Sequence, residues 1–314
     1  MPSTRLSGTI VPLVTPFSPD DSLDIPALNN LIDYVMEQGA DALMPTALTG
    51  EGPLLTDSEK IGVWDAVFEK ANGRIPVVPA VITLTTRKAI ELVRAAETRG
   101  APAVMVTPIL PELYASRSED DVLAFYSDVA SASSLPIILF NYPSLTGIDF
   151  VPSLVAKLAK VENVQYIKES TGDIRRVHGI QRLVGDRITV ICGAPNVAME
   201  SLCLGCKAWI TGIMNDAPRS AQQLMRAIIV RNDLTLARRI YFQQILPLVD
   251  VMARNYNPTG TIKAGVCARG VNVGSPRRPG HGVSSEDFKI IKRIATAIAK
   301  AEVSTARELE INRV

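Results

Sequence analysis

Residues 164–173, VQYIKESTGD, join a buried strand to a turn and place one lysine at the junction. The apolar, partly β-branched run from Val164 to Ile167 is typical of a buried strand. The Ser-Thr-Gly-Asp sequence that follows is typical of a turn and a helix N-cap. We therefore expect Lys168 at the carboxyl end of a buried strand, beside a loop.

Burial would change the chemistry of Lys168. A lysine that loses its hydration is harder to charge, so its pKa falls. The neutral amine is a nucleophile towards carbonyl carbons, and buried lysines form Schiff bases for this reason. A lysine at a strand end can also extend its ammonium group into solvent. This segment alone leaves both interpretations open.

Short apolar segments alternate with amphipathic ones along most of the chain. The pattern predicts strands at residues 7–15, 42–45, 76–81, 103–107, 136–141, 164–168, 188–193 and 208–211. It predicts helices at residues 26–38, 56–72, 86–99, 120–132, 151–160, 174–184, 196–204 and 219–230. Strict alternation of this kind indicates an α/β protein with a parallel sheet, and eight units fit a closed (β/α)₈ TIM barrel.

The strand pattern stops near residue 230. Helices are predicted at residues 234–252, 262–271 and 284–310, with a basic loop at residues 277–282 that we expect to be a solvated connector. We therefore predict a barrel over residues 1–230 and a C-terminal helical extension over residues 231–314, packed on the barrel.

The composition is that of an ordinary globular protein. The chain has 314 residues, 47% of them hydrophobic, and a formal net charge of +1. This balance argues against nucleic acid or a charged membrane surface as the main partner. No apolar run is long enough to cross a membrane, and residues 1–5 are not followed by the apolar stretch of a secretory signal, so we expect a cytoplasmic protein.

Few residues are available for metal or redox chemistry. The only histidines are His178, inside a predicted helix, and His281, in a late loop, which disfavours a histidine metal site or a Ser-His-Asp triad. Cys203 and Cys206 form a C-x-x-C pair without a second ligand pair, and we expect both to be small buried residues. No dinucleotide or P-loop motif is present, so neither a cofactor nor a metal is predicted.

The carboxyl ends of the strands form the active-site face of such a barrel. Lys168 is the one lysine among the hydroxyl, glycine and apolar residues predicted there. The turn Leu48-Thr49-Gly50-Glu51 can offer backbone N–H groups to a carboxylate. Together they suggest a site for a 2-keto acid. The lysine would attack the ketone, and the resulting iminium would accept electrons when a carbon–carbon bond breaks.

Several motifs occur together and in order: GTIVPLVTPF at residues 8–17, TGE at 49–51, NYPSLTG at 141–147 and IKESTGD at 167–173. With these motifs the chain resembles the N-acetylneuraminate lyase / dihydrodipicolinate synthase family of pyruvate-type class I aldolases. The resemblance implies a TIM barrel with C-terminal helices, usually as a homotetramer. It implies that Lys168 forms the Schiff base, that Leu48 and Thr49 hold the substrate carboxylate, and that the Ile210 backbone lines the pocket.

Some positions depart from the family pattern. Phe140 stands where the family has a proton-shuttling tyrosine, and Leu48 where a proton-relaying threonine is common. Ile109 and Leu110 replace two tyrosines of the synthases, and Leu145 replaces the arginine that receives a second carboxylate. The pattern therefore looks nearer to aldolases that cleave 2-keto-3-deoxy sugar acids than to true dihydrodipicolinate synthases.

We therefore predict a carbon–carbon lyase that cleaves such a substrate to pyruvate and an aldehyde, as a homo-oligomer. Tyr142 or Tyr114 could replace the missing tyrosine, the substrate carboxylate or a water molecule could carry the proton, or the enzyme could be impaired. Alternatives are a related dehydratase, deaminase or synthase acting on a 2-keto acid, and a non-catalytic binder of 2-keto acids.

Overall fold

The computed structural model describes residues 5–108, 118–255 and 257–311. Within them, eight parallel strands form one sheet in the order β2-β1-β8-β7-β6-β5-β4-β3. The strands are β1 Gly8–Pro12, β2 Ala42–Met44, β3 Ala80–Thr83, β4 Val104–Pro108, β5 Ile137–Asn141, β6 Val164–Glu169, β7 Thr189–Cys192 and β8 Ala208–Ile210.

The sheet closes between its first and last members. Leu43 of β2 makes a parallel bridge to Val77, just before β3. Backbone hydrogen bonds continue this contact, because the N–H of Val78 donates to the carbonyl of Leu43 and that of Ala80 to the carbonyl of Pro45. The predicted (β/α)₈ barrel is therefore confirmed. The chain reaches β3 later than the sequence pattern indicates, since residues 76–79 contribute only this narrow bridge.

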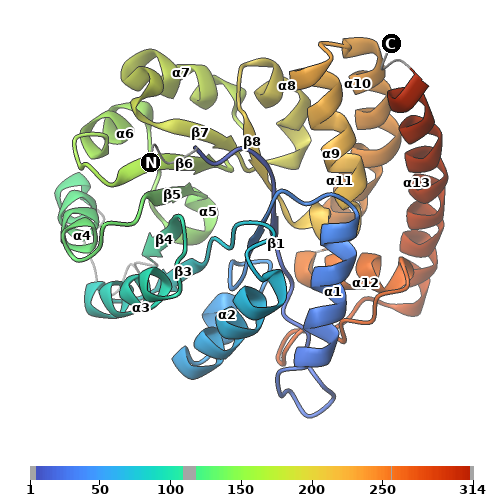
Figure 1. Cartoon of the computed structure of the whole chain (residues 1–314), viewed down its shortest axis with the longest axis horizontal. Coiled ribbons are helices and arrows are strands. Elements are labelled where there is room, and N and C mark those ends of the chain that lie inside the picture. Colours follow the sequence, from blue (N-terminus) through green and yellow to red (C-terminus); the bar gives the residue numbers. More distant parts are fainter. Residues whose placement is uncertain (1–4, 109–117, 256, 312–314) are drawn as a thin grey trace.

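Helices surround the barrel (Figure 1). The helices connecting the strands are α1 Ile25–Glu37, α2 Asp57–Ala71, α3 Thr86–Thr98, α4 Glu119–Ser131, α5 Pro143–Thr146, α6 Pro152–Leu158, α7 Ile174–Val184 and α8 Ala198–Cys203. Those that follow β8 are α9 Pro218–Met225, α10 Leu234–Ile240, α11 Leu246–Arg254, α12 Pro258–Ala268 and α13 Ser285–Ile311.

Local chemistry fixes where the helices begin. Thr56 caps α2 as a complete capping box: its hydroxyl accepts the N–H of Glu59, whose carboxylate accepts the N–H of Thr56. Asp173 caps α7 by accepting the N–H of Arg175 at 3.0 Å. The second cap sets the end of the loop that follows Lys168, as the Ser-Thr-Gly-Asp sequence predicts.

The helix predicted at residues 234–252 is interrupted. A π-type turn at Tyr241–Ile245 separates α10 from α11, which continues to Arg254. Pro247 lies at the start of α11 and has no N–H to donate, so the regular helical hydrogen-bond ladder cannot run through this point. Within the described residues, no helix is both long and apolar enough to cross a membrane.

Successive side chains of each strand point to opposite faces of the sheet and pack in two separate hydrophobic cores. One set packs inside the barrel and includes Met105, Ile138, Phe140 and Tyr166. The other set faces the surrounding helices and forms the larger core between sheet and helices. This alternation decides which strand residues can reach the interior of the barrel.

Candidate active site

Lys168 is the fifth residue of β6 and lies at its carboxyl end, as predicted. It pairs in register with Phe140 of β5 on one side and Ile191 of β7 on the other. Phe140 and Ile191 both belong to the core inside the barrel. Lys168 therefore projects into the barrel at the face where active sites of this architecture are built.

The surroundings of Lys168 are apolar. The residue is only 8% exposed, and its Nζ lies 4.3 Å from the centre of the Phe140 ring. Among the described residues, no carboxylate pairs with the Lys168 amine. Burial lowers the pKa of Lys168 from 10.5 to about 8, so about a tenth of the amine is neutral at pH 7, far more than for an ordinary lysine.

Gly193, directly after β7, leaves room for the lysine side chain. A Cβ at this position would lie 2.9 Å from Lys168 Cγ, 2.8 Å from the carbonyl oxygen of Glu169 and 2.0 Å from Ser170 Oγ. These contacts include backbone that cannot move easily, so only glycine fits here. Gly193, the residue directly after β7, is thus required by the close approach of Lys168, Glu169 and Ser170.

The turn after β2 is tightly folded. Thr46 and Glu51 have positive φ angles of 59° and 56°, which non-glycine residues rarely adopt. The Thr46 hydroxyl donates to the carbonyl of Ala80 at 2.8 Å and accepts the indole N–H of Trp64 at 2.8 Å. Gly52 is needed because a Cβ there would lie 1.9 Å from the carbonyl oxygen of Thr46. These contacts hold the turn in one shape.

The structure brings this turn to the barrel interior. Leu48 packs against the interior core, which also contains Phe140 and Ile210. Thr49 lies beside Gly212, just after β8, because a Cβ on Gly212 would be 3.2 Å from Thr49 Oγ1. The residues predicted to hold a substrate carboxylate are thus grouped at the same end of the barrel as Lys168.

Tyr142 is at the edge of this group. It is 39% exposed, and its ring centre is 6.0 Å from that of Phe140. Leu145, in the short helix α5, is 41% exposed. Tyr114, Ile109 and Leu110 lie outside the described residues. Of the two tyrosines considered as replacements for the missing one, Tyr142 is the one whose position is described, and its ring lies beside that of Phe140.

Another buried lysine, which the sequence reasoning missed, lies behind the turn. Lys263 of α12 forms an ion pair with Glu51 at 2.7 Å, with side chains 1% and 5% exposed, and donates to the carbonyl of Ser275 at 2.9 Å. Burial lowers the pKa of Lys263, while the nearby Glu51 carboxylate acts in the opposite direction. The signal in the sequence was a lysine inside the apolar run TIKAGV, residues 261–266.

The loop predicted to be a solvated connector is anchored instead. The Arg277 guanidinium lies 4.4 Å from the Phe17 ring centre and pairs with Glu59 of α2. Its backbone N–H donates to Glu51 at 2.8 Å. The expectation was wrong for Arg277. The basic composition of the loop does not reveal that this guanidinium stacks on Phe17 and pairs with Glu59. Arg278, which is 75% exposed in its side chain, fits the expectation better.

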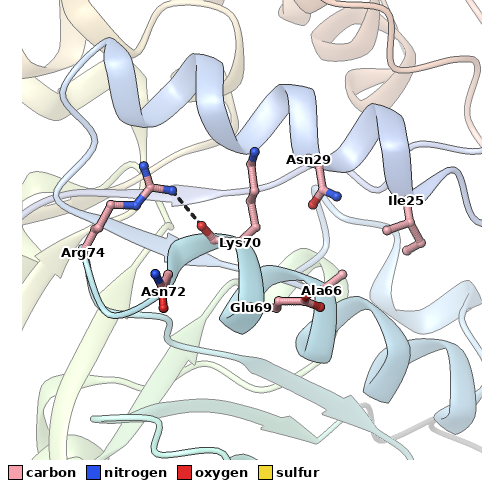
Figure 2. Close-up of a pocket in the computed structure, with 7 residues that line it drawn as sticks. All are labelled: Ile25, Asn29, Ala66, Glu69, Lys70, Asn72 and Arg74. Carbon is pink, nitrogen blue, oxygen red and sulfur yellow. Dashed lines mark hydrogen bonds between the residues drawn. The ribbon is translucent and has the colours of Figure 1, made fainter.

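One cleft away from the barrel mouth offers no chemistry comparable to that of Lys168. A cleft of about 360 Å³ lies between α1 and α2 and is lined by the residues labelled in Figure 2. Two of its charged groups interact locally: Arg74 donates to the carbonyl of Lys70 at 2.7 Å, and Lys70 pairs with Asp33 at 2.6 Å. The cleft lies on the outer helices, away from Lys168.

The cysteines differ from expectation in one respect. Cys206 is buried, as predicted, but Cys203 is exposed. Both thiols have raised pKa values because of burial, and the shift is much larger for Cys206. Within the part of the chain that the structure describes, no group of three histidine, cysteine or acidic side chains is arranged to hold a metal ion.

Comparison with known proteins identifies the family of this chain. A model described as the dihydrodipicolinate synthetase family matches residues 5–298. A 4-hydroxy-tetrahydrodipicolinate synthase from Archaeoglobus fulgidus is 33% identical over 292 residues, covering 93% of this chain and 98% of the relative. The family resemblance inferred from the motifs is therefore confirmed.

Two solved structures were determined with pyruvate bound. YagE from Escherichia coli K12, a prophage protein of the dihydrodipicolinic acid synthase family, has a TM-score of 0.88 and 25% identity, covering 94% of this chain and 99% of its own. Dihydrodipicolinate synthase from Acinetobacter baumannii has a TM-score of 0.88 and 26% identity, with coverages of 94% and 99%.

Proposed function

Because this chain belongs to the dihydrodipicolinate synthetase family, we propose that it is a Schiff-base-forming lyase that acts on 2-keto acids of the pyruvate type. The observation that carries the proposal is Lys168, a buried lysine inside the barrel mouth whose pKa is lowered to about 8. The pyruvate complexes of the two structural relatives support the substrate class.

In this mechanism the neutral amine of Lys168 attacks the ketone carbon and loses water to give an iminium. The backbone N–H groups of the turn at Leu48 and Thr49 hold the substrate carboxylate, while Phe140 and Ile210 line the pocket. When the C3–C4 bond breaks, its electron pair moves to the iminium and forms an enamine. Protonation at C3 and hydrolysis then release pyruvate, with Tyr142 as one group able to move a proton.

For the second part of the substrate we propose a 2-keto-3-deoxy sugar acid, which is cleaved to pyruvate and an aldehyde. Support comes from Leu145 and Phe140, since neither can bind or protonate a second carboxylate. Synthase activity on a second carboxylated substrate is the alternative, and the name of the Archaeoglobus fulgidus relative favours it. A non-catalytic binder of 2-keto acids is a third possibility. We also propose that the protein is a homo-oligomer, a tetramer or a dimer.

Borohydride trapping tests the proposal. The protein is incubated with pyruvate, reduced, digested with trypsin and analysed by mass spectrometry. We expect a pyruvyl adduct on a peptide spanning residues 161–175, because a modified Lys168 is no longer cut. Lys168→Ala should give no adduct there, and Lys157→Ala, which alters an exposed lysine, should behave like the natural protein.

Product analysis then separates the candidates. Release of pyruvate from 2-keto-3-deoxy sugar acids indicates the lyase. Faster condensation of pyruvate with aspartate semialdehyde would instead support the synthase. An adduct without turnover of any substrate would support the binder, and the absence of any adduct in folded protein would refute the Schiff-base mechanism.

A further inference from the structure

Thr107 lies in the same row of the barrel as Lys168. The register pairs Ile82 with Thr107, and Val106 with Leu139, which places Thr107 beside Phe140. Phe140 in turn pairs with Lys168. The row therefore runs from β4 to β6 as Thr107, Phe140 and Lys168, with the phenylalanine in the middle.

The Thr107 side chain points into the barrel. Side chains alternate along a strand, so residues two positions apart share a face. Met105, Ile138 and Tyr166, two positions before the three members of the row, all belong to the interior core. Thr107 therefore faces the interior at the level of Phe140 and Lys168.

Among the residues that the structure describes, the Thr107 hydroxyl has no hydrogen-bond partner. The residue is 1% exposed, and among the described residues its Oγ1 makes no hydrogen bond. Other buried threonines are satisfied: Thr15 donates to the carbonyl of Gly50 at 2.6 Å, and Thr46 donates to that of Ala80. Buried hydroxyls are normally hydrogen-bonded, so one without a partner is usually explained by a ligand or an ordered water.

The spacing suits a substrate bonded to Lys168. Adjacent strands are about 4.8 Å apart, so the backbones of Thr107 and Lys168 are separated by about 10 Å. An extended lysine side chain that carries a keto acid can span this distance. The C4 hydroxyl of that substrate would then come to the Thr107 side of Phe140, the residue that stands in place of the tyrosine.

We propose that Thr107 is a catalytic residue, the proton-relay hydroxyl of this site. This inference rests on the proposed Schiff-base function. The Thr107 hydroxyl hydrogen-bonds the C4 hydroxyl of the bound 2-keto acid, or a water molecule when the substrate is pyruvate, which has no C4.

During cleavage, the proton that leaves the C4 hydroxyl is balanced by the proton that C3 receives. The C3–C4 bond breaks, and its electron pair passes to the iminium to form the enamine. The proton of the C4 hydroxyl moves to Thr107 Oγ1 while the original Thr107 proton moves to a water molecule in the mouth, and the C4 oxygen becomes the aldehyde carbonyl. The proton returns from that water to C3 of the enamine, so Thr107 and the water end unchanged.

Pyruvate in deuterated water tests the relay without knowledge of the aldehyde. Enamine formation and reversal exchange the methyl hydrogens of pyruvate for deuterium, which NMR follows. Thr107→Val keeps the shape and removes the hydroxyl. We expect exchange to slow roughly 10- to 100-fold, at or below the lower end of general acid–base effects, while the borohydride-trapped adduct forms to the same extent.

Two variants control the result. Thr107→Ser keeps the hydroxyl and should retain most of the exchange rate. Thr83→Val removes a threonine hydroxyl from the adjacent strand β3, at a position whose side chain faces away from the barrel interior. It should leave the exchange rate unchanged.

Three outcomes would overturn the inference. Exchange in Thr107→Val within about twofold of the natural protein would show that the hydroxyl carries no proton. A serine variant as slow as the valine variant would assign the effect to packing. If the natural protein forms no adduct, the proposed function fails and this inference fails with it, whereas a normal adduct with normal exchange in Thr107→Val removes only the relay.

Discussion

Lys168 and Lys263 are both buried lysines, but within the described residues only Lys263 has a carboxylate beside it. Lys263 is paired with Glu51 and also donates to the carbonyl of Ser275. Lys168 contacts the face of Phe140 and lies in the apolar mouth of the barrel. The two residues are about equally hidden from solvent, and their surroundings give them different roles.

The difference shows how a neighbouring carboxylate determines the role of a buried lysine. Burial lowers the pKa of both residues, but Glu51 opposes this effect at Lys263 and so favours its charged form. At Lys168 burial is the main influence, and the pKa falls to about 8. A paired charge can act as a structural link, whereas an unpaired one destabilises the fold and is typical of a reactive site.

Replacing each lysine by methionine should distinguish the two roles most clearly. Lys168→Met should abolish the pyruvate adduct and lower the rate of pyruvate exchange by about 10⁴-fold or more, as expected for loss of a catalytic nucleophile. Its thermal midpoint should not fall, because methionine fills the space without burying an amine. Adduct formation by mass spectrometry and thermal unfolding measure the two effects. A large loss of stability would mean that Lys168 is a structural residue.

Lys263→Met should have the reverse profile. It leaves the Glu51 carboxylate buried without its cation, which typically costs about 3–5 kcal/mol of unfolding free energy. Denaturant unfolding measures this loss. The double variant Lys263→Met with Glu51→Met removes both charges and should recover much of the stability. If the double variant is as unstable as the single one, packing around α12 rather than the ion pair explains the loss.

The pH dependence of labelling sharpens the contrast further. Because the pKa of Lys168 is lowered to about 8, its neutral fraction rises with pH up to that value and then levels. Acylation of Lys168 by a small reagent should therefore increase about tenfold per pH unit below 8 and reach a plateau above it. The pKa of Lys157 is raised by its pairing with Glu119, so its labelling should still be rising at pH 10. Mass spectrometry of the two peptides gives both profiles, and continued rise at Lys168 would contradict the assigned pKa.

The sequence could predict the parts of this site that depend on local order. The apolar run before Lys168 and the turn residues after it predict a strand end, and the strand alternation predicts the barrel. The capping box at Thr56 and the cap at Asp173 are likewise local, and both are present. Lys168, Leu48 and Thr49 could be placed at one face because the carboxyl ends of parallel strands meet there, whereas Ile210 was predicted through the family resemblance.

Features that depend on distant partners could not be predicted. Glu51 and Lys263 are more than 200 residues apart, and neither has a local pattern that identifies the other. Arg277 was expected to be solvated because its loop is basic, yet it stacks on Phe17 and pairs with Glu59. The unpaired state of Thr107 is also invisible in sequence, since it requires knowledge of every neighbour of its hydroxyl.

The smallest effect on stability should come from Arg277, whose backbone N–H donates to Glu51, the partner of Lys263. Its guanidinium pairs with Glu59 and donates to the backbone of Asp21 at 2.7 Å. Lysine cannot reproduce this planar fork, so Arg277→Lys should cost about 1 kcal/mol of unfolding free energy. The link to Glu51 should survive, since it uses the backbone N–H of Arg277. Arg278→Lys, at an exposed ion pair, is the matched control and should have a smaller effect.

The dependence of this loss on pH identifies the pairing. Hydrogen bonding from Arg277 is the largest cause that lowers the pKa of Glu59 from 4.5 to about 2. A carboxylate with a lowered pKa stabilises the fold above its unfolded pKa and loses that contribution as the pH falls towards its folded value. The difference in unfolding free energy between the natural protein and Arg277→Lys should thus be constant above about pH 5 and shrink between pH 4.5 and 2. Denaturant unfolding across this range measures it. A difference that does not change with pH would assign the loss to stacking on Phe17 instead, and would leave the buried pair of Lys263 and Glu51 as the main electrostatic link between the turn and α12.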